Sequence, residues 1–108
     1  MAYDFNVLEQ SAAKLMEMGR HADAVKIFLF MSDGDSSLDG GWLGWRLGEC
    51  YEALGDLHAA SYWHGRAVEE NPEIRRESAA ARERLRPLLG IDDLLVVKNP
   101  KLPPLSST

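Results

Sequence analysis

The feature that most restricts the fold of this chain is a set of small and turn-forming residues at fixed spacing near its centre. Gly48 and Ala60 are small where two neighbouring helices could approach closely, and Gly55, between them, can adopt the left-handed conformation of a tight turn. Pro72 has no backbone N–H and cannot continue a helix, so it marks the end of the second helix. This spacing predicts a pair of antiparallel helices between about residues 41 and 72.

The same spacing occurs a second time, earlier in the chain. Gly19 precedes Gly55 by 36 residues. At this offset the sequence superposes Ala24 on Ala60, Phe28 on His64 and Met31 on Ala67. The first copy departs from the second at three positions: Ala12 replaces Gly48, Leu15 replaces Tyr51 and Ser36 replaces Pro72. A second helix pair is therefore expected at about residues 5–36.

Together the two copies resemble the tetratricopeptide repeat (TPR) family, whose repeats of about 34 residues each form two packed helices. The extra length of the offset in this chain fits into the loop at residues 32–41. The resemblance implies an all-α fold, a TPR-like stack of antiparallel helix hairpins (an α-α superhelix) with about five helices. The residues at structural TPR positions are Ala24, Phe28, Leu47, Gly48, Tyr51, Gly55, Ala60, Ala67 and Pro72.

The chain is expected to divide into a TPR-like domain at residues 1–90 and a terminal segment at 91–108, which is apolar at first and then Pro-rich and flexible. Within the domain we expect repeat 1 at about 5–36, repeat 2 at about 41–72 and a helix that caps the stack at about 73–89. Two repeats and one helix are a thin stack, because about three repeats are usually needed for independent stability. Either residues 91–97 complete the core or two chains pair, and both alternatives stay open.

Capping residues indicate where the helices begin and end. Asn6 followed by Glu9 fits a capping box at the start of the first helix, and Gly19 suits its end. Asp39 and Asp56 are expected to cap the third and fourth helices. The helices after the first are expected at about 21–31, 40–54, 57–70 and 73–89.

Charge is unevenly distributed along the chain. Residues 1–72 carry 5 basic and 12 acidic side chains, a net charge of −7, whereas the whole chain has −5. An acidic surface repels a phosphate backbone, so nucleic acid is not an expected partner. The chain has neither the apolar run of ~20 residues that a membrane span needs nor the pattern of a secretory signal, so we expect no membrane contact. A single cysteine fits a cytoplasmic location.

The TPR resemblance also implies where a partner would bind. In the family, ligand contacts come from set positions on the first helix of each pair, which line a concave groove. Carried over by the alignment, these positions are Asn6, Glu9, Ala13, Met16 and Glu17 in the first copy, Trp42, Trp45, Glu49 and Glu52 in the second, and Ile74, Glu77, Ala81 and Arg84 on the cap helix.

The chemistry of these positions indicates the kind of partner. On the first helices of the two pairs, four of them are glutamates and two are tryptophans, which favours a segment that combines apolar anchors with Lys or Arg. The alternative for Trp45 is a packing role in the core, because family members often carry a packing Trp one position earlier. Some TPR proteins bind a C-terminal carboxylate through Lys and Asn, but Glu9, Ala13 and Glu49 occupy the corresponding positions.

The sequence gives little indication of a metal site or of catalysis. Asp33, Asp35, Ser37 and Asp39 alternate as at the start of a calcium loop, but the required Gly and Glu are missing further on. We interpret the segment as a solvated loop and expect no metal and no cofactor. His64 is expected in the core, Cys50 is interpreted as a buried structural thiol, and no residue is assigned a catalytic role.

We therefore expect a non-catalytic adaptor or scaffold that holds a peptide or helix of a partner protein in the TPR groove. Two alternatives remain: a self-associating, homodimeric TPR protein, and a small TPR-like chaperone of a secretion or assembly system.

Overall fold

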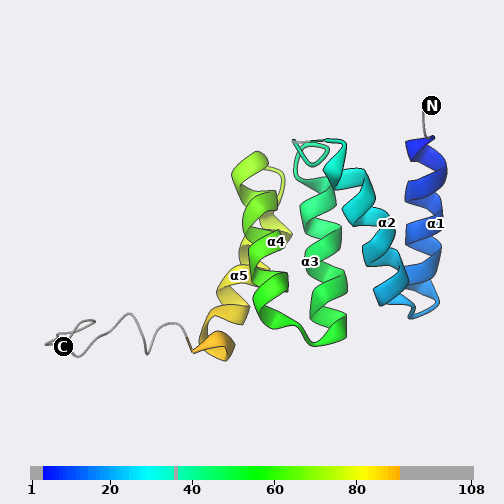
Figure 1. The fold of residues 1–108 in the computed structure, drawn as a ribbon. Helices are drawn as coiled ribbons and strands as arrows, with labels where there is room; N and C mark the ends of the chain where they lie inside the picture. The colour runs from blue at the N-terminus through cyan, green and yellow to red at the C-terminus, as the bar shows by residue number, and fades with distance from the viewer. Residues whose placement is uncertain (1–3, 36, 91–108) are drawn as a thin grey trace, which may run out of the picture.

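The computed structural model describes residues 4–35 and 37–90, and these form five α-helices (Figure 1). The helices are α1 (Phe5–Glu17), α2 (His21–Asp33), α3 (Trp42–Leu54), α4 (Leu57–Glu70) and α5 (Arg76–Leu89). The described residues contain no strand. Each helix packs on the next one in the chain, and α5 also reaches α3. The predicted all-α helix-hairpin stack is confirmed.

The two hairpin turns that the repeats predict have the same construction. Gly19 and Gly55 both adopt left-handed conformations, with φ of 78° and 84°. In each turn the following residue donates its N–H to the carbonyl five positions earlier, Arg20 to Leu15 at 2.8 Å and Asp56 to Tyr51 at 2.9 Å. These bonds satisfy carbonyls that the end of a helix leaves without partners. The 36-residue offset therefore corresponds to a repeated local structure.

Two predicted helix caps are wrong. The Asp4 carboxylate, not Asn6, caps α1, because it accepts from the backbone N–H groups of Asn6 and Val7 at 3.0 and 3.3 Å. Gly41, not Asp39, precedes α3 and makes no side-chain cap. The predicted cap of α4 is confirmed, since Asp56 accepts from the N–H of Ala59 at 3.1 Å.

Helix α5 begins later than the sequence predicts. The chain leaves α4 at Asn71 and makes a turn over residues 72–74, so the helix starts at Arg76 instead of at about residue 73. It packs on α4 through three buried residues, Ser78, Ala81 and Leu85. The expected apolar segment at 91–97 lies outside the described residues. Across the described part of the chain, no helix has both the length and the apolar character of a membrane span.

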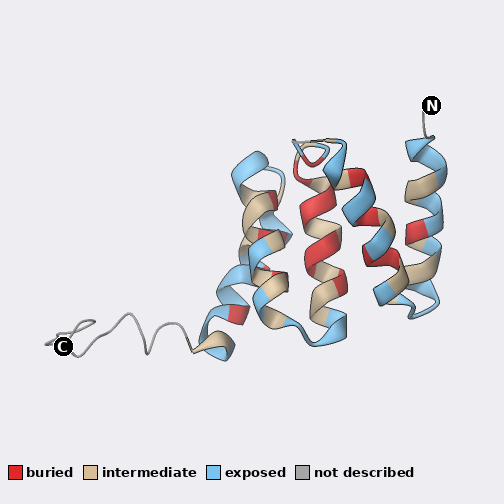
Figure 2. Cartoon of the chain, in the orientation of Figure 1, coloured by how far each residue is buried: buried red, intermediate tan, exposed pale blue. Residues whose placement is uncertain are grey.

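The tightest contact in the fold joins α3 to α4. A Cβ atom at Gly48 would lie 2.6 Å from atoms of the His64 ring, and one at Gly44 would lie 2.9 Å from the Trp63 carbonyl oxygen. Such separations are far shorter than van der Waals contact, so only glycine fits at either position. The close approach predicted at Gly48 is confirmed. Helix α3 consequently carries many buried positions (Figure 2).

The core runs from α1 to α3 as one apolar cluster. Ala12, Ala24 and Phe28 are fully buried, as are Leu47 and Cys50. Ala12 occupies the place in the first hairpin that Gly48 holds in the second, and Phe28 the place of His64. The first hairpin thus buries an aromatic hydrocarbon where the second buries a polar ring.

The sequence predicted a solvated loop between α2 and α3, and this prediction is wrong for Leu38. Leu38 is only 3% exposed and belongs to the core cluster, although its φ is 55°. The Asp35 carboxylate holds the loop by accepting from the Ser37 hydroxyl at 2.7 Å and from the N–H groups of Ser37 and Asp39 at 3.0 Å. The hydroxyl bond lowers the pKa of Asp35. Burial of Leu38 offsets a left-handed conformation that costs roughly 1–2 kcal/mol.

The α3–α4 contact gives a first prediction. Gly48→Ala should lower the free energy of unfolding by about 1–2 kcal/mol, because overpacking costs more than the helix propensity that alanine adds. Gly65→Ala is the matched control in α4, where the nearest atom to a new Cβ is in the flexible Arg82 side chain at 3.4 Å. It should be neutral or stabilise by up to about 1 kcal/mol. Urea unfolding measures the free energy of unfolding of both variants. If Gly48→Ala stabilised the protein as Gly65→Ala does, the close contact at Gly48 would be contradicted.

Candidate functional site

The predicted partner-binding residues lie on α1, α3 and α5 and on the turn before α5, with different degrees of exposure. Five are exposed: Asn6, Glu17, Ile74, Glu77 and Arg84. Seven are half-buried: Glu9, Ala13, Met16, Trp42, Trp45, Glu49 and Glu52. Ala81 is buried and offers almost no surface to a partner.

The two predicted tryptophans differ in their surroundings. Trp42 meets Phe28 edge to face, with 5.7 Å between ring centroids, and packs against the apolar core. The Arg46 guanidinium carbon lies 5.7 Å from the Trp42 ring centre and 5.4 Å from that of Trp45. A cation over the face of an indole is attracted by the ring quadrupole, so Arg46 links the two rings. Trp42 is therefore partly a core residue, whereas Trp45 is held by polar neighbours.

Arg75 is a residue of this surface that the sequence analysis did not include. Its guanidinium carbon lies 5.8 Å from the centre of the Trp45 ring, and its Nε donates to the Gly40 carbonyl at 3.3 Å. It therefore joins the turn before α5 to the loop before α3. Thirty positions separate Arg75 from Trp45, and no periodic pattern connects them, so the sequence carried no signal for this pair. We call Trp45, Arg46 and Arg75 the Trp45 cluster.

Two of the four predicted carboxylates on α1 and α3 already have arginine partners. Arg46 Nη1 donates to Glu49 at 2.9 Å. Arg84 donates to both oxygens of Glu52, at 2.7 and 3.1 Å. Glu9 and Glu17 make no ion pair with any residue in the described ranges. The carboxylates that this surface can offer to a partner are thus Glu9 and Glu17 on α1 and the exposed Glu77 on α5, which also makes no ion pair with another described residue.

A buried series of polar groups joins α3, α4 and α5. His64 lies between Glu52, 3.1 Å from its Nε2, and Ser78, 2.9 Å from its Nδ1. An ionised carboxylate only accepts, so Nε2 carries the proton and Nδ1 accepts from the Ser78 hydroxyl. Burial lowers the pKa of His64 below 6.5, and the Arg84 hydrogen bonds lower the pKa of Glu52 below 4.5. At neutral pH, every member of the series Ser78–His64–Glu52–Arg84 therefore has a partner.

The first three members of this series match the order of a serine nucleophile, its base and an orienting carboxylate. Ser78 is 0% exposed and His64 is 1% exposed, however, so a substrate cannot reach either side chain in this conformation. Burial also raises the pKa of the Cys50 thiol to about 11, which leaves it protonated and weakly nucleophilic at neutral pH. The Ser78–His64–Glu52–Arg84 series therefore holds α3, α4 and α5 together inside the fold.

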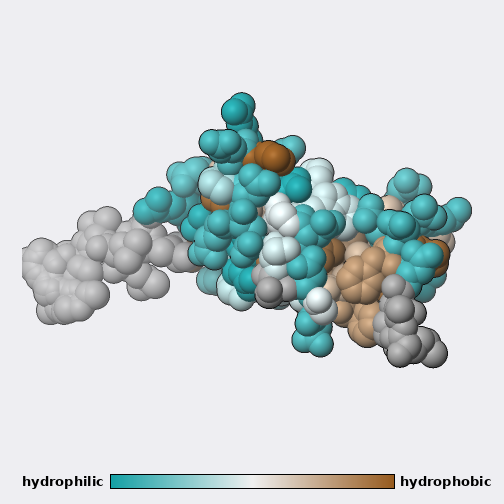
Figure 3. Space-filling view, turned by 90° about the horizontal axis from the view of Figure 1, so that it is seen from above, coloured by the Kyte–Doolittle hydropathy of each residue, from teal (hydrophilic) through white to brown (hydrophobic). Residues whose placement is uncertain are grey.

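Metal ligands do not gather in the described ranges, where no three His, Cys, Asp or Glu side chains lie close enough together to hold an ion. The alternating acidic loop binds its own backbone and hydroxyl groups through Asp35. Seen from above the orientation of Figure 1, the surface is mostly hydrophilic with separate hydrophobic patches (Figure 3).

Comparisons with known proteins identify no relative. No protein-family model matches the chain, and neither a curated protein nor a solved structure matches it.

The buried series gives a second prediction. The folded state binds the Glu52 proton more weakly than the unfolded state, so this group stabilises the fold above pH 4.5 and its contribution is lost as the pH falls below that value. Arg84→Gln should therefore lower the free energy of unfolding at neutral pH and reduce its fall below pH 4.5. Because the Arg84 side chain is 58% exposed, solvent screening limits the loss to about 1 kcal/mol.

Arg82→Gln is the matched control for this measurement. It removes the same charge from the same helix, but Arg82 forms no ion pair with another described residue. Urea unfolding of both variants at about pH 7 and about pH 3 separates the loss of the Glu52–Arg84 bridge from the general loss of one positive charge. Equal losses at neutral pH in the two variants would show that the Glu52–Arg84 bridge adds nothing specific.

Proposed function

We propose that this chain is a non-catalytic adaptor of the TPR type, which holds a segment of a partner protein on the surface formed by α1, α3 and the start of α5. The observation that carries this proposal is the Trp45 cluster, in which one indole contacts two guanidinium groups. Trp and Arg are the residue types that contribute most to binding at protein interfaces. Side chains that their neighbours already hold in place lose less entropy when a partner binds.

The distribution of charge supports a partner of mixed chemistry. Glu9 and Glu17 on α1 have no ion-pair partner among the described residues, whereas Glu49 and Glu52 are bound to Arg46 and Arg84. We place a Lys or Arg of the partner towards α1, which carries two such carboxylates, and its apolar residue against Trp45. Glu77 at the start of α5 is a further exposed carboxylate without an ion pair among the described residues. The charged pair would contribute mainly to the rate and orientation of association.

Exposed apolar residues on α1 favour self-association as a second candidate. Val7 on α1 and Met18, the residue that follows α1, are both more than half exposed. A second copy of the chain that packed on α1 would cover them and extend the core. Sedimentation at decreasing concentration separates the two functions, because an adaptor monomer keeps a mass of 12.0 kDa and a dimer doubles it.

The adaptor proposal predicts a large effect of one substitution. A partner captured from native lysate and identified by mass spectrometry should bind Trp45→Ala roughly 30-fold more weakly or worse, because an interface hot spot contributes about 2 kcal/mol or more. Titration calorimetry with the purified partner measures the affinity, and circular dichroism checks that the variant is folded. Leu54→Ala, an exposed apolar residue of the same helix, is the control and should bind normally. Equal affinities of the wild type and Trp45→Ala would exclude this surface.

The charge proposal is tested by removing the two α1 carboxylates. Glu9→Gln with Glu17→Gln should slow association with the same partner several-fold at low salt and make the rate less dependent on salt, because long-range attraction is lost. Stopped-flow fluorescence measures the rate. The control, Glu70→Gln with Glu83→Gln, changes the net charge equally on α4 and α5. A rate that falls equally in both variants would indicate a general effect of net charge instead of a local one.

A further inference from the structure

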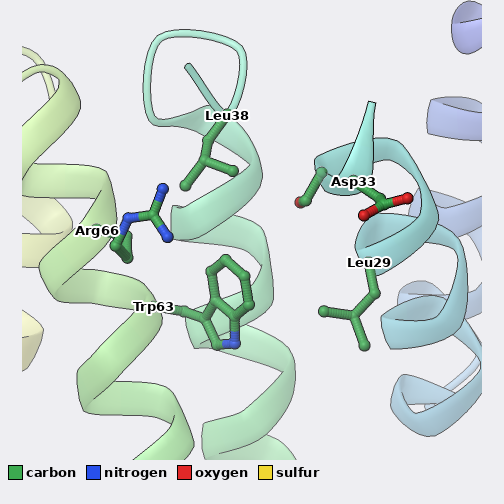
Figure 4. A pocket seen from close by; sticks show the side chains of 6 residues that line it. Leu29, Asp33, Leu38, Trp63 and Arg66 are labelled. Atoms are coloured by element: carbon green, nitrogen blue, oxygen red, sulfur yellow. The ribbon is translucent and has the colours of Figure 1, made fainter. Parts of the chain in front are cut away.

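A pocket lies between α2 and α4, away from the surface proposed above. It has a volume of about 320 Å³, and the loop before α3 forms one of its walls (Figure 4). None of the predicted groove residues lines it. The lining residues are Leu29, Ser32, Asp33, Leu38, Trp63 and Arg66. Its size is at the lower end of the range for ligand pockets in proteins, which suits one or two side chains of a partner.

Arg66 is held in position at the α4 wall of the pocket. Its guanidinium carbon lies 6.0 Å from the centre of the Trp63 ring, and its Nη1 donates to the Tyr62 hydroxyl at 3.2 Å. Its ion pair with Glu69 is long, at 3.9 Å, and the Glu69 side chain is 72% exposed. The guanidinium is therefore oriented by neutral neighbours, and its charge is only weakly compensated. An arginine fixed in this way loses little entropy when it binds a carboxylate.

The α2 wall and the loop wall carry the apolar Leu29 and Leu38 beside the polar Ser32 and Asp33. Leu29 on α2 is 37% exposed, so part of its side chain is accessible at the pocket. Leu38 enters from the loop in a left-handed conformation, with φ of 55°. Strained backbone of this kind is found preferentially at functional sites. The Ser32 hydroxyl already donates to the Phe28 carbonyl at 2.8 Å, so it adds no donor to the pocket.

We propose that this pocket is a second docking site, for a partner segment that presents an apolar side chain next to a carboxylate. The apolar side chain packs between Leu29, Leu38 and Trp63, and the carboxylate pairs with Arg66. Asp33 lies on the opposite wall, on α2, and repels a carboxylate there. The segment therefore binds in one direction, with its acidic group towards α4. A partner that is held on the α3 surface would leave this site available.

The experiment uses N-acetyl-L-leucine as a probe of the full-length chain, because it carries the proposed carboxylate and apolar side chain in one molecule. The chain has 3 tryptophans, so the indole N–H signals in a proton–nitrogen NMR spectrum distinguish this pocket from the Trp42 and Trp45 surface. Only the Trp63 signal should shift on titration. N-acetyl-L-leucinamide, which lacks the carboxylate, should bind about two- to fivefold more weakly, the range expected for an exposed ion pair.

Two variants of the pocket test the charges directly. Arg66→Gln should remove the preference for the acid over the amide, and Asp33→Asn should strengthen binding of the acid. The matched control is Arg76→Gln, since Arg76 lies on α5 and its Nε donates only to the Glu73 carbonyl. This variant should behave as the wild type.

Several results would overturn the proposal. The Trp63 signal could remain unchanged while those of Trp42 or Trp45 shift, or the acid and the amide could bind the wild type equally. A Trp63 signal that moves on dilution of the protein alone would mean that a second copy of the chain covers the pocket. The comparison of acid with amide needs no variant, so it remains decisive even if Arg66→Gln does not fold.

Discussion

The close contact between α3 and α4 is the constraint on which the rest of the structure depends. Gly44 and Gly48 carry no side chain, so the backbone of α4 and the His64 ring can lie directly against α3. That approach brings His64 within hydrogen-bonding distance of Glu52 and lets Ser78 reach the ring from α5. A side chain at Gly48 would overlap the His64 ring, so the helices would have to move apart or the ring would have to shift.

The sequence predicted those parts of the fold that depend on local backbone geometry or on residue size. Gly55 and Asp56 define the turn before α4 and its cap, and α4 has the expected boundaries. Other features depend on competition between similar groups. Asp4 and Asn6 can both cap a helix, and only the geometry of the first turn selects Asp4. The burial of Leu38 could not be predicted, because the Ser, Asp and Gly residues around it are typical of a solvated loop.

The candidate site was less predictable, because its properties come from pairs that are far apart in sequence. Glu52 meets Arg84, and Trp45 meets Arg75, across about thirty positions that follow no helical period. The pairing changes the chemistry of the surface, since a glutamate bound to an internal arginine cannot attract a basic partner in the same way. The sequence indicated a groove in which four glutamates surround two indoles. The structure instead has acidic residues without internal partners on α1 and a mixed aromatic and cationic cluster on α3.

The series from Ser78 to Arg84 also determines how the molecule can open. Removing α5 from its place would leave Nδ1 of His64 without its hydrogen-bond donor and Glu52 without its arginine partner, so α3, α4 and α5 are coupled as one cooperative unit. Helix α1 is attached through apolar contacts around Ala12, and within the described residues its side chains form no hydrogen bond or ion pair with another helix. Local fluctuations should therefore begin at α1, and its amide protons should exchange with solvent before those of the other end of the stack.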